Sequence, residues 1–356
     1  MTTLYTYRGT EQAPELVGLA YVNQRRGRLA STFAYDQLYL ANAHTQPVDP
    51  ELPLQAGNWP VRYELPGSFM DSTPDRWGRN LINKRYPNKR LNNLDYLIGV
   101  SDISRQGALR FKTEQEGDFQ FPDTRVPKLM ALSELLDATQ ALDDTHREAE
   151  AVQFLLDAGS GSLGGARPKA VVEKDGRLFL AKFPHAHDSY DVITAEYETL
   201  VQAKRNGMDV PECELIAVGS AKVLLVERFD RCLKDGCNER IPYISAMTAL
   251  RAQDGEQRDY LEILDFISRA GSHPRQDTLE LLRRIRYTLE VNNTDDHLRN
   301  HGFLYTNGGW HLSPLFDVNP NPNCATPRQT ALGGHTDAEG SLMVLEELEA
   351  DRGTKE

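Results

Sequence analysis

A polar cluster between two apolar stretches carries the strongest chemical signal in the sequence. Its residues are Asn293-Thr294-Asp295-Asp296-His297-Leu298-Arg299-Asn300. Phosphoryl-transfer loops place an aspartate that accepts the substrate hydroxyl proton five residues before an asparagine that binds Mg²⁺. Asp295 and Asn300 have this spacing, and Asp317 follows as a second acidic residue. We therefore expect Asp295 to be a catalytic base and Asn300 and Asp317 to hold Mg²⁺, which favours carboxylate and amide oxygens.

His297, inside the same cluster, has two interpretations. Its ring can contact a bound cofactor or metal, or it can brace the loop by hydrogen bonds. The residue type alone does not decide between them, so His297 stays a candidate cofactor-binding residue.

A glycine-rich stretch, 159–169, is a candidate phosphate-binding loop. Glycines let backbone N–H groups surround a phosphate, and a lysine nearby neutralises its charge. The stretch is not a Walker A motif, because Pro168 precedes Lys169 and no Ser or Thr follows the lysine. A flexible linker is the alternative interpretation. The candidate cofactor-binding residues of this stretch are Ser162, Gly164, Gly165, Ala166 and Lys169.

Two further segments fit an ATP site. Lys182 lies in an apolar, strand-like segment, where kinases place the lysine that contacts the α- and β-phosphates, with Glu196 or Glu198 as its partner. An outward position on a strand would explain Lys182 equally well. The segment 226–231 resembles a hinge whose backbone groups bind adenine, which makes Glu227 and Phe229 candidates; a surface turn is the alternative.

Periodicity and turn residues predict the elements that position these groups. Strands are expected at 17–21, 27–34 and 108–111, a hairpin at 170–183 around Lys174-Asp175-Gly176, and a strand at 222–226. Helices are expected at 74–84, capped by Ser72 or Thr73, at 193–205, and at 277–290, capped through Asp277 and Glu280. The mixture predicts an α+β fold. The domains are expected to be an N-terminal β-rich subdomain (1–112), a linker (113–127), an ATP-binding part (128–230) and a catalytic part (231–356).

Composition limits the classes of function. The 356 residues suffice for about two domains. With 52 acidic and 40 basic residues the net charge is -12, which disfavours non-specific nucleic-acid binding. The four cysteines form no C-x-x-C pair, as is typical of proteins in a reducing compartment. Neither a signal peptide nor an apolar run of membrane-spanning length is visible, so the cytoplasm is the expected location and no membrane partner is expected.

Together the motifs resemble the HipA family of bacterial toxin–antitoxin systems, over nearly the whole chain to about residue 340. The segment 165–169 is similar to the family's glycine-rich loop, 226–231 to its hinge, 293–300 to its catalytic loop, and Asp317 to its metal aspartate. The segments 72–78 and 107–111 resemble parts of the family's N-terminal subdomain. The catalytic loop is the more specific of these matches.

The resemblance implies a two-lobed kinase fold, distantly like those of protein kinases and phosphoinositide kinases. It implies an ATP- and Mg²⁺-dependent serine/threonine kinase that acts on a protein, aminoacyl-tRNA synthetases being known targets in the family. The usual partner is a small helix-turn-helix antitoxin, and the complex represses its own operon, so DNA is contacted only indirectly through the antitoxin. A serine of the glycine-rich loop is autophosphorylated in the family, which points to Ser162, or to its neighbour Ser160.

Two alternatives stay open. Family members usually have several helices after the metal aspartate, whereas 39 residues follow Asp317 here. A catalytically weak or inactive module that binds an antitoxin or an operator complex is therefore one alternative. A kinase of a small molecule or lipid head group would use the same ATP machinery, although no basic or amphipathic membrane segment supports a lipid substrate.

Overall fold

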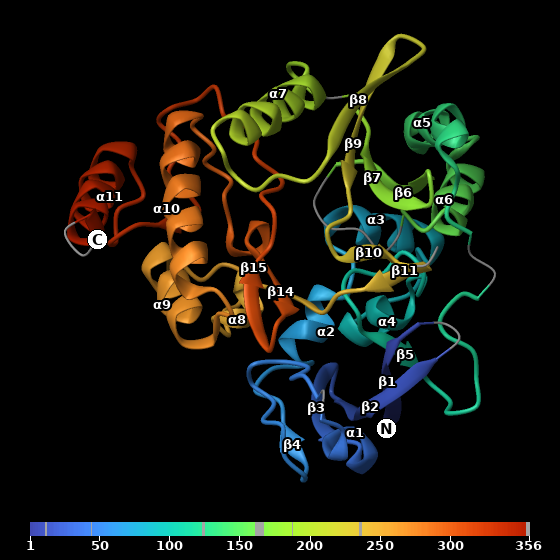
Figure 1. The fold of residues 1–356 in the computed structure, drawn as a ribbon. Helices are drawn as coiled ribbons and strands as arrows, with labels where there is room; N and C mark the ends of the chain where they lie inside the picture. The colour runs from blue at the N-terminus through green and yellow to red at the C-terminus, as the bar shows by residue number, and fades with distance from the viewer. Residues whose placement is uncertain are drawn as a thin grey trace. The chain divides into compact units, whose positions relative to one another are not determined.

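A computed structural model describes residues 1–10, 13–43, 45–122, 125–160, 167–186, 188–234 and 237–353. Contacts within the chain divide it into two compact units, 1–189 with 215–243, and 190–214 with 244–356. Helices and small sheets, most of them antiparallel, alternate in both units (Figure 1), so the predicted α+β fold is confirmed. None of the helices described is both long enough and apolar enough to cross a membrane.

The chain begins with a five-stranded antiparallel sheet of order β4-β3-β2-β1-β5. Its strands are β1 (Thr2–Gly9), β2 (Pro14–Arg25), β3 (Arg28–Tyr35), β4 (Trp59–Pro60) and β5 (Arg110–Lys112). The β2–β3 turn contains only Arg26 and Gly27, both with positive φ, which matches the twist of a tight hairpin. The three strands predicted in this region are confirmed, the third starting two residues later than expected.

Four short helices accompany this sheet, α1 (Gln37–Ala41), α2 (Gly67–Asp71), α3 (Arg76–Arg85) and α4 (Asn93–Ile98). The prediction that Ser72 or Thr73 caps the third helix is wrong, because the N-cap is Asp75 and Pro74 lies outside the helix. The hydroxyls of Ser72 and Thr73 instead donate to the carbonyl groups of Ser68 and Met70 at the end of α2. These residues therefore close the preceding helix and do not open the next one.

The same unit contains a second, four-stranded sheet of order β6-β7-β9-β8. Its strands are β6 (Lys169–Lys174), β7 (Arg177–Lys182), β8 (Cys213–Val218) and β9 (Ala221–Glu227). Two helices, α5 (Leu132–Gln140) and α6 (Glu148–Asp157), pack against it. The hairpin predicted around Lys174-Asp175-Gly176 is confirmed, with positive φ at Asp175 and Gly176. A further hairpin, β10 (Arg231–Lys234) and β11 (Cys237–Arg240), follows β9.

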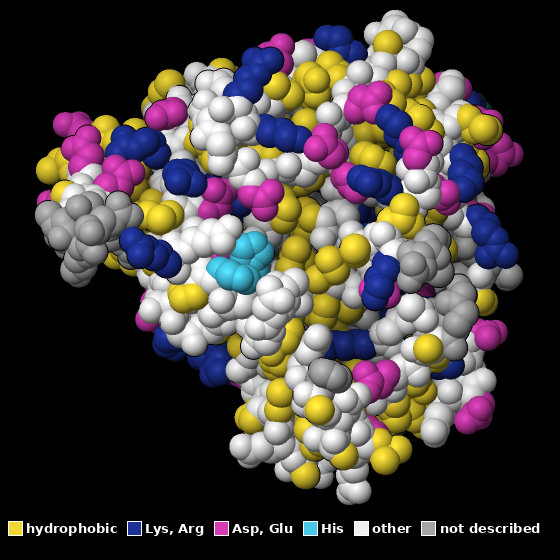
Figure 2. Space-filling view, viewed as in Figure 1, with side chains coloured by type: hydrophobic (Ala, Val, Ile, Leu, Met, Phe, Trp, Pro, Cys, Tyr) yellow, Lys and Arg dark blue, Asp and Glu magenta, His cyan; other side chains and the backbone are white. Residues whose placement is uncertain are grey.

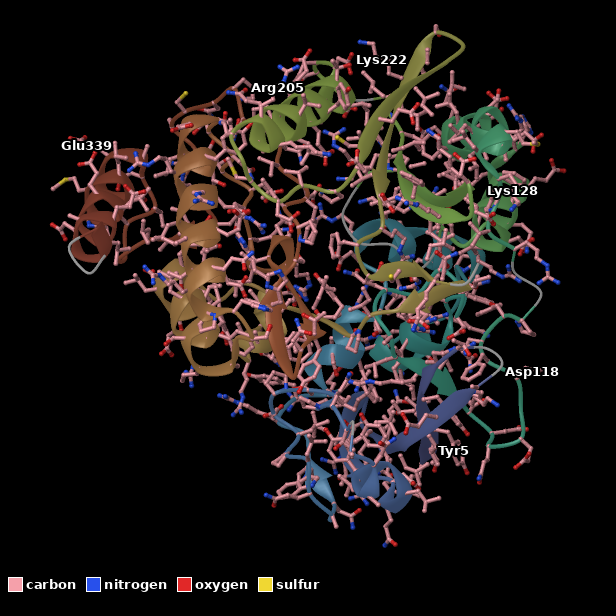
Figure 3. All side chains as sticks on the ribbon, viewed as in Figure 1. Tyr5, Asp118, Lys128, Arg205, Lys222 and Glu339 are labelled. Carbon is pink, nitrogen blue, oxygen red and sulfur yellow. The ribbon has the colours of Figure 1, made fainter. Side chains whose placement is uncertain are left out.

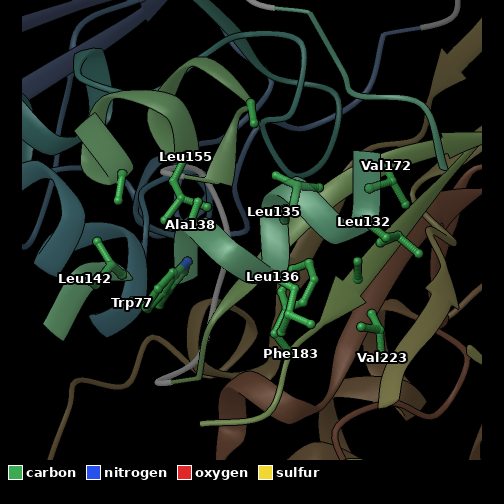
Figure 4. Packing of buried hydrophobic residues seen from close by; sticks show 14 of the residues in the cluster. Trp77, Leu132, Leu135, Leu136, Ala138, Leu142, Leu155, Val172, Phe183 and Val223 are labelled. Atoms are coloured by element: carbon green, nitrogen blue, oxygen red, sulfur yellow. The ribbon is translucent and has the colours of Figure 1, made fainter. Parts of the chain in front are cut away.

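One apolar core contains residues of the N-terminal subdomain as well as residues of the β6-β7-β9-β8 sheet and its helices. Trp77 of α3, Leu135 of α5, Leu155 of α6 and Phe183 after β7 belong to the same buried cluster (Figure 4). The indole N–H of Trp77 also donates to the carbonyl oxygen of Lys169, at 3.2 Å. Each large side chain buried in this way contributes roughly 1.5–3 kcal/mol to the stability of the fold, so the N-terminal subdomain and the β6-β7-β9-β8 sheet stabilise one another.

The second unit is largely helical. Its helices are α7 (Val192–Arg205), α8 (Ala246–Ala249), α9 (Tyr260–Ala270), α10 (Pro274–Glu290) and α11 (Ala338–Gly353). Its short strands are β12 (Tyr243–Ser245), β13 (Arg258–Asp259), β14 (Gly302–Thr306), β15 (Gly309–Leu312) and β16 (Thr330–Ala331). The sheet β12-β14-β15 packs with α9 and α10 around Ile263, Ile285 and Phe303 (Figure 1).

The start of α10 differs from the expectation. The prediction that Asp277 caps this helix is wrong, because the helix begins at Pro274 with His273 as its N-cap. Proline fits the first helical turn, where its missing N–H would have no helical partner. The Asp277 carboxylate is buried and accepts a hydrogen bond from the backbone N–H of Leu312, at 3.1 Å, and it lies 2.8 Å from Nδ1 of His311. Asp277 therefore attaches β15 to α10.

Candidate active site

The predicted catalytic loop follows directly after α10. The helix ends at Glu290, and Asn292 takes a left-handed backbone conformation with φ 52°, which asparagine tolerates better than most residues. The N–H of Asn293 still bonds to the carbonyl oxygen of Thr288, at 3.0 Å. The loop is thus attached to a rigid helix at its first residue, as a catalytic group requires.

The two consecutive aspartates of this loop have opposite environments. Asp295 is exposed, whereas Asp296 is 6 % exposed. The carboxylate of Asp296 accepts hydrogen bonds from the hydroxyl of Tyr260 and from Nε2 of His301, the latter at 3.1 Å. Its partners thus hold Asp296 in the fold, while Asp295 can reach a substrate. The choice of Asp295 as candidate base therefore agrees with its exposure.

Electrostatics support the same division. Burial alone would raise the pKa of Asp296, but His301 and the two hydrogen bonds hold that pKa below its usual range. Burial raises the pKa of Tyr260 well above its usual value, so its hydroxyl stays a donor. A neutral tyrosine and an ionised aspartate form a charge-assisted hydrogen bond, which is stronger than one between neutral groups.

Asn300 lies next to Asp295 in space. The residues 298–300 form one turn of 3-10 helix, and the Asn300 side-chain nitrogen donates to the backbone oxygen of Asp295, at 3.1 Å. This bond uses the nitrogen of the amide and leaves its oxygen for a metal. The backbone N–H of Asn300 donates to the carbonyl oxygen of His297, at 2.8 Å. Nδ1 of the His297 ring is buried and has no hydrogen-bond partner in the described part of the chain. The hydrogen bonds that brace the loop come from His301 and from the backbone carbonyl of His297.

Asp317 belongs to a second loop, which is hydrogen-bonded to the first. The side-chain nitrogen of Asn321 donates to the hydroxyl of Thr294, at 2.7 Å, and that of Asn292 donates to the carbonyl oxygen of Asn321, at 2.6 Å. Asp317 itself has φ 58°. A left-handed backbone conformation is uncommon for residues other than glycine, and aspartate is among those that tolerate it best.

The donor set suits Mg²⁺. Asp317 offers a carboxylate and Asn300 an amide oxygen, and Mg²⁺ is commonly bound through one or two carboxylates together with water and phosphate oxygens. Oδ1 of Asn319, two residues after Asp317, is buried and makes no hydrogen bond within the described residues. A polar atom left in this way beside an aspartate fits a site that receives a hydrated cation.

The other candidate residues lie in the first unit. Lys182 is 5 % exposed on β7 and directly faces Lys169 of β6, which is 4 % exposed. Cross-strand partners project from the same face of a sheet, and like charges there repel each other. Lys169 and Lys182 therefore share one face of this sheet. By contrast, Lys222 is exposed at the start of β9 (Figure 3), as expected of an ordinary strand lysine.

The hinge candidates lie where β9 ends. The backbone N–H of Arg228 donates to the carbonyl oxygen of Leu178 on β7, at 2.9 Å. Consecutive residues of an extended strand direct their backbone N–H and C=O groups to opposite edges of the strand. The backbone N–H and C=O of Glu227 therefore point away from β7. Phe229 follows in a turn, with its ring 6.2 Å from that of Tyr243.

Most of the glycine-rich loop falls outside the described residues, including Ser162, Gly164, Gly165 and Ala166. At its borders, Ser160 is fully buried, and its hydroxyl has no hydrogen-bond partner among the residues that the structure describes. Arg167 forms an ion pair with Asp188, whose other carboxylate oxygen accepts from the backbone N–H of His185.

Comparison with known proteins shows the family to which the chain belongs. Residues 161–354 match the model of the HipA-like C-terminal domain, and residues 17–112 match that of the HipA N-terminal domain. The chain belongs to the HipA family. The solved complex of HipA, HipB and operator DNA from Shewanella oneidensis MR-1 superposes with a TM-score of 0.72 at 17% identity, covering 97% of this chain and 84% of that chain. The predicted HipA-like kinase fold is thereby confirmed.

Two relatives share sequence with this HipA-family chain. "Putative kinase Y4mE" of Sinorhizobium fredii is 27% identical over 335 residues, covering 84% of this chain and 73% of the relative. A "Putative kinase" of Haemophilus influenzae is 28% identical over 142 residues, covering 36% of this chain and 41% of the relative.

Two features of this HipA-family chain were missed from sequence. One is the support of the catalytic loop by Tyr260, Asp296 and His301. The sequence indicated this support only through the two consecutive aspartates. The other is that the charged side chains of the segment 228–231 bind the N-terminal subdomain. Their partners are backbone carbonyl groups more than 120 positions away in the sequence. A pattern of side-chain types cannot predict a partner that is a backbone group.

Proposed function

We propose that the chain is an ATP- and Mg²⁺-dependent serine/threonine protein kinase of the HipA type. The observation that carries the proposal is the pair of loops in the second unit. An exposed Asp295 lies beside Asn300, and the loop of Asp317 is hydrogen-bonded to Thr294. Acceptor, amide and second carboxylate are the groups with which kinases carry out phosphoryl transfer.

Each residue has a role in the proposed reaction. Asp295 orients the substrate hydroxyl and accepts its proton. Asn300 and Asp317 would hold Mg²⁺, which neutralises phosphate charge when bound. Lys169 and Lys182 attract the α- and β-phosphates, and the backbone at Glu227 and Phe229 receives the adenine. Positioning and charge neutralisation supply most of the rate enhancement in such reactions.

The proposed partners follow from the family. The Shewanella protein was solved with HipB and operator DNA, which supports a small helix-turn-helix antitoxin as the partner of this chain. Lys and Arg side chains are interspersed with Asp and Glu over the visible face (Figure 2), and the net charge is -12. Contact with DNA is therefore proposed only through the antitoxin. The protein target, proposed to be a component of translation such as an aminoacyl-tRNA synthetase, would be met in the cytoplasm.

Autophosphorylation of the glycine-rich loop is proposed as the mode of regulation. A phosphate on Ser162 adds nearly two negative charges beside the triphosphate and repels it. Ser160 is the weaker candidate, because its hydroxyl would first have to leave a fully buried position. Peptide mapping after incubation with Mg·ATP tests this: phosphate is expected on Ser162, and its absence from both serines in protein that phosphorylates another substrate would reject the switch.

Transfer of radiolabel from ATP tests the proposed activity itself. With cell lysate added, label is expected on a protein of the lysate as well as on the chain. Label that appears only on small molecules would indicate a small-molecule kinase. ATP binding without any transfer would indicate an inactive binding module.

A further inference from the structure

A buried ionic cluster, formed by Arg228, Asp230 and Arg231, lies within the segment proposed to receive adenine. Their exposed fractions are 8 %, 3 % and 9 %, respectively. The Asp230 carboxylate binds Arg228 through both its oxygens, at 2.9 and 2.7 Å, and Arg231 at 2.7 Å. Burial alone would raise the pKa of Asp230, but the two guanidinium groups hold it well below its usual range. The three side chains thus form one hydrogen-bonded ionic unit.

This unit binds a loop of the N-terminal subdomain, residues 104–107. Arg228 donates to the carbonyl oxygen of Ser104, at 2.7 Å, and Arg231 to that of Arg105, at 2.5 Å. In return, the backbone N–H of Gly107 donates to the Asp230 carboxylate, at 2.7 Å. Gly107 has φ 73°, and a Cβ there would meet the Cβ of Tyr243 at 3.3 Å, so the close approach depends on glycine.

We infer that Asp230 is a positioning residue for the nucleotide, which holds the adenine-binding backbone of Glu227 and Phe229 in place by attaching it to the loop 104–107. The inference rests on the proposed function. Glu227 and Phe229 flank Arg228, so the ionic cluster attaches this segment to the loop 104–107 through its side chains. A preorganised backbone binds without first having to be ordered, and this raises affinity. The N-terminal subdomain therefore supports the adenine site through this cluster.

Asp102 provides a matched control. It is also a buried carboxylate that binds two arginines, Arg110 at 2.6 Å and Arg240 at 3.0 Å, and its side chain is 8 % exposed against 4 % for Asp230. Its partners lie outside 227–231. Asp102→Asn and Asp230→Asn should both lower stability, but only the second should loosen the adenine-binding segment.

The test is calorimetric titration of the full chain with a non-hydrolysable ATP analogue and, separately, with Mg·tripolyphosphate, which has no adenine. We expect Asp230→Asn to bind the analogue roughly tenfold more weakly than wild type, with tripolyphosphate binding and kcat at saturating ATP unchanged. Asp102→Asn should bind both ligands like wild type. Unchanged analogue affinity in Asp230→Asn, or equal losses in the two variants, would overturn the inference.

A second variant covers the case in which Asp230→Asn does not fold. Arg231→Lys keeps the positive charge but loses the second nitrogen that reaches the loop 104–107, and a weakening in the same direction is expected. Wild-type affinity in Arg231→Lys would then overturn the inference. Failure of the wild-type chain itself to bind the analogue would overturn the proposed function, and the inference with it.

Discussion

The catalytic loop, 292–301, and the hinge segment, 226–231, are both rich in charged residues, but the fold uses those charges differently. In the catalytic loop one carboxylate is buried as support, and its neighbour is exposed for chemistry. In the hinge segment Arg228, Asp230 and Arg231 are all buried and paired with one another, so these three charges support the fold. A charged motif therefore marks a functional segment without showing which of its residues act.

The largest effect is expected at the metal ligand of the catalytic side. Asp317→Asn removes the carboxylate charge but tolerates the left-handed backbone, unlike Asp317→Ala. Turnover should fall by at least about 100-fold, because phosphoryl transfer needs its charge neutralised. Titration should also show weaker Mg·ATP binding and unchanged binding of metal-free ATP. Wild-type affinity and turnover together would remove Asp317 from the site.

The next effect concerns the phosphate lysine. Lys182→Met keeps the apolar stem of a buried strand residue and removes the ammonium group, so ATP-analogue affinity or turnover should drop by roughly 10–100-fold. Lys222→Met, on the exposed start of β9, is the matched control and should behave like wild type. If the two variants are indistinguishable, Lys182 is only a strand residue.

A smaller effect is expected from the support of the catalytic loop. Tyr260→Phe keeps the ring and removes the hydrogen bond to Asp296, which is worth about 1.5–3 kcal/mol for a charged acceptor. Part of that loss should appear as a kcat about tenfold lower with an unchanged KM for ATP, because the base is less well held. A variant that is less stable but has wild-type kcat would show that the support is structural only.

The smallest effect is expected on the stability of the fold, from a residue of the β14–β15 hairpin, which lies between the two catalytic loops in the sequence. The Asp277 carboxylate raises the pKa of His311, so this pair stabilises the fold below the unfolded pKa of about 6.5 and contributes less as pH rises through the folded value. The stability of wild type over His311→Gln should therefore be up to about 1 kcal/mol larger at pH 6 than at pH 8. Denaturant unfolding at the two pH values measures the difference, and a constant difference would exclude the linkage.

Sequence predicted most of the helices and strands, and it predicted that Asp295 and Asn300 belong to one loop. Apolar periodicity predicted α10, and the turn residues Asp175-Gly176 predicted the β6–β7 hairpin, because both signals are local. Asp295 and Asn300 could be paired from spacing alone, since one turn of helix joins them.

The errors have a common physical cause. The sequence pattern predicts Asp277 as one helix cap and Ser72 or Thr73 as another, yet Asp277 binds β15 and the two hydroxyls close α2. A short polar side chain can satisfy any backbone group that the fold brings near it. Likewise, no feature of the sequence at 104–107 predicts that this loop binds Asp230. Domain boundaries and the roles of the phosphate-loop residues stay predictions.

Steady-state phosphorylation by Asp295→Asn tests the central claim most directly. The substitution keeps the shape of an exposed side chain, so ATP affinity and thermal stability should stay close to wild type. Turnover should fall by roughly 10²–10⁴-fold, the usual contribution of a general base. Asp265→Asn, another exposed carboxylate of the same unit, is the control and should keep full activity. Near-wild-type turnover in folded Asp295→Asn protein would contradict the account.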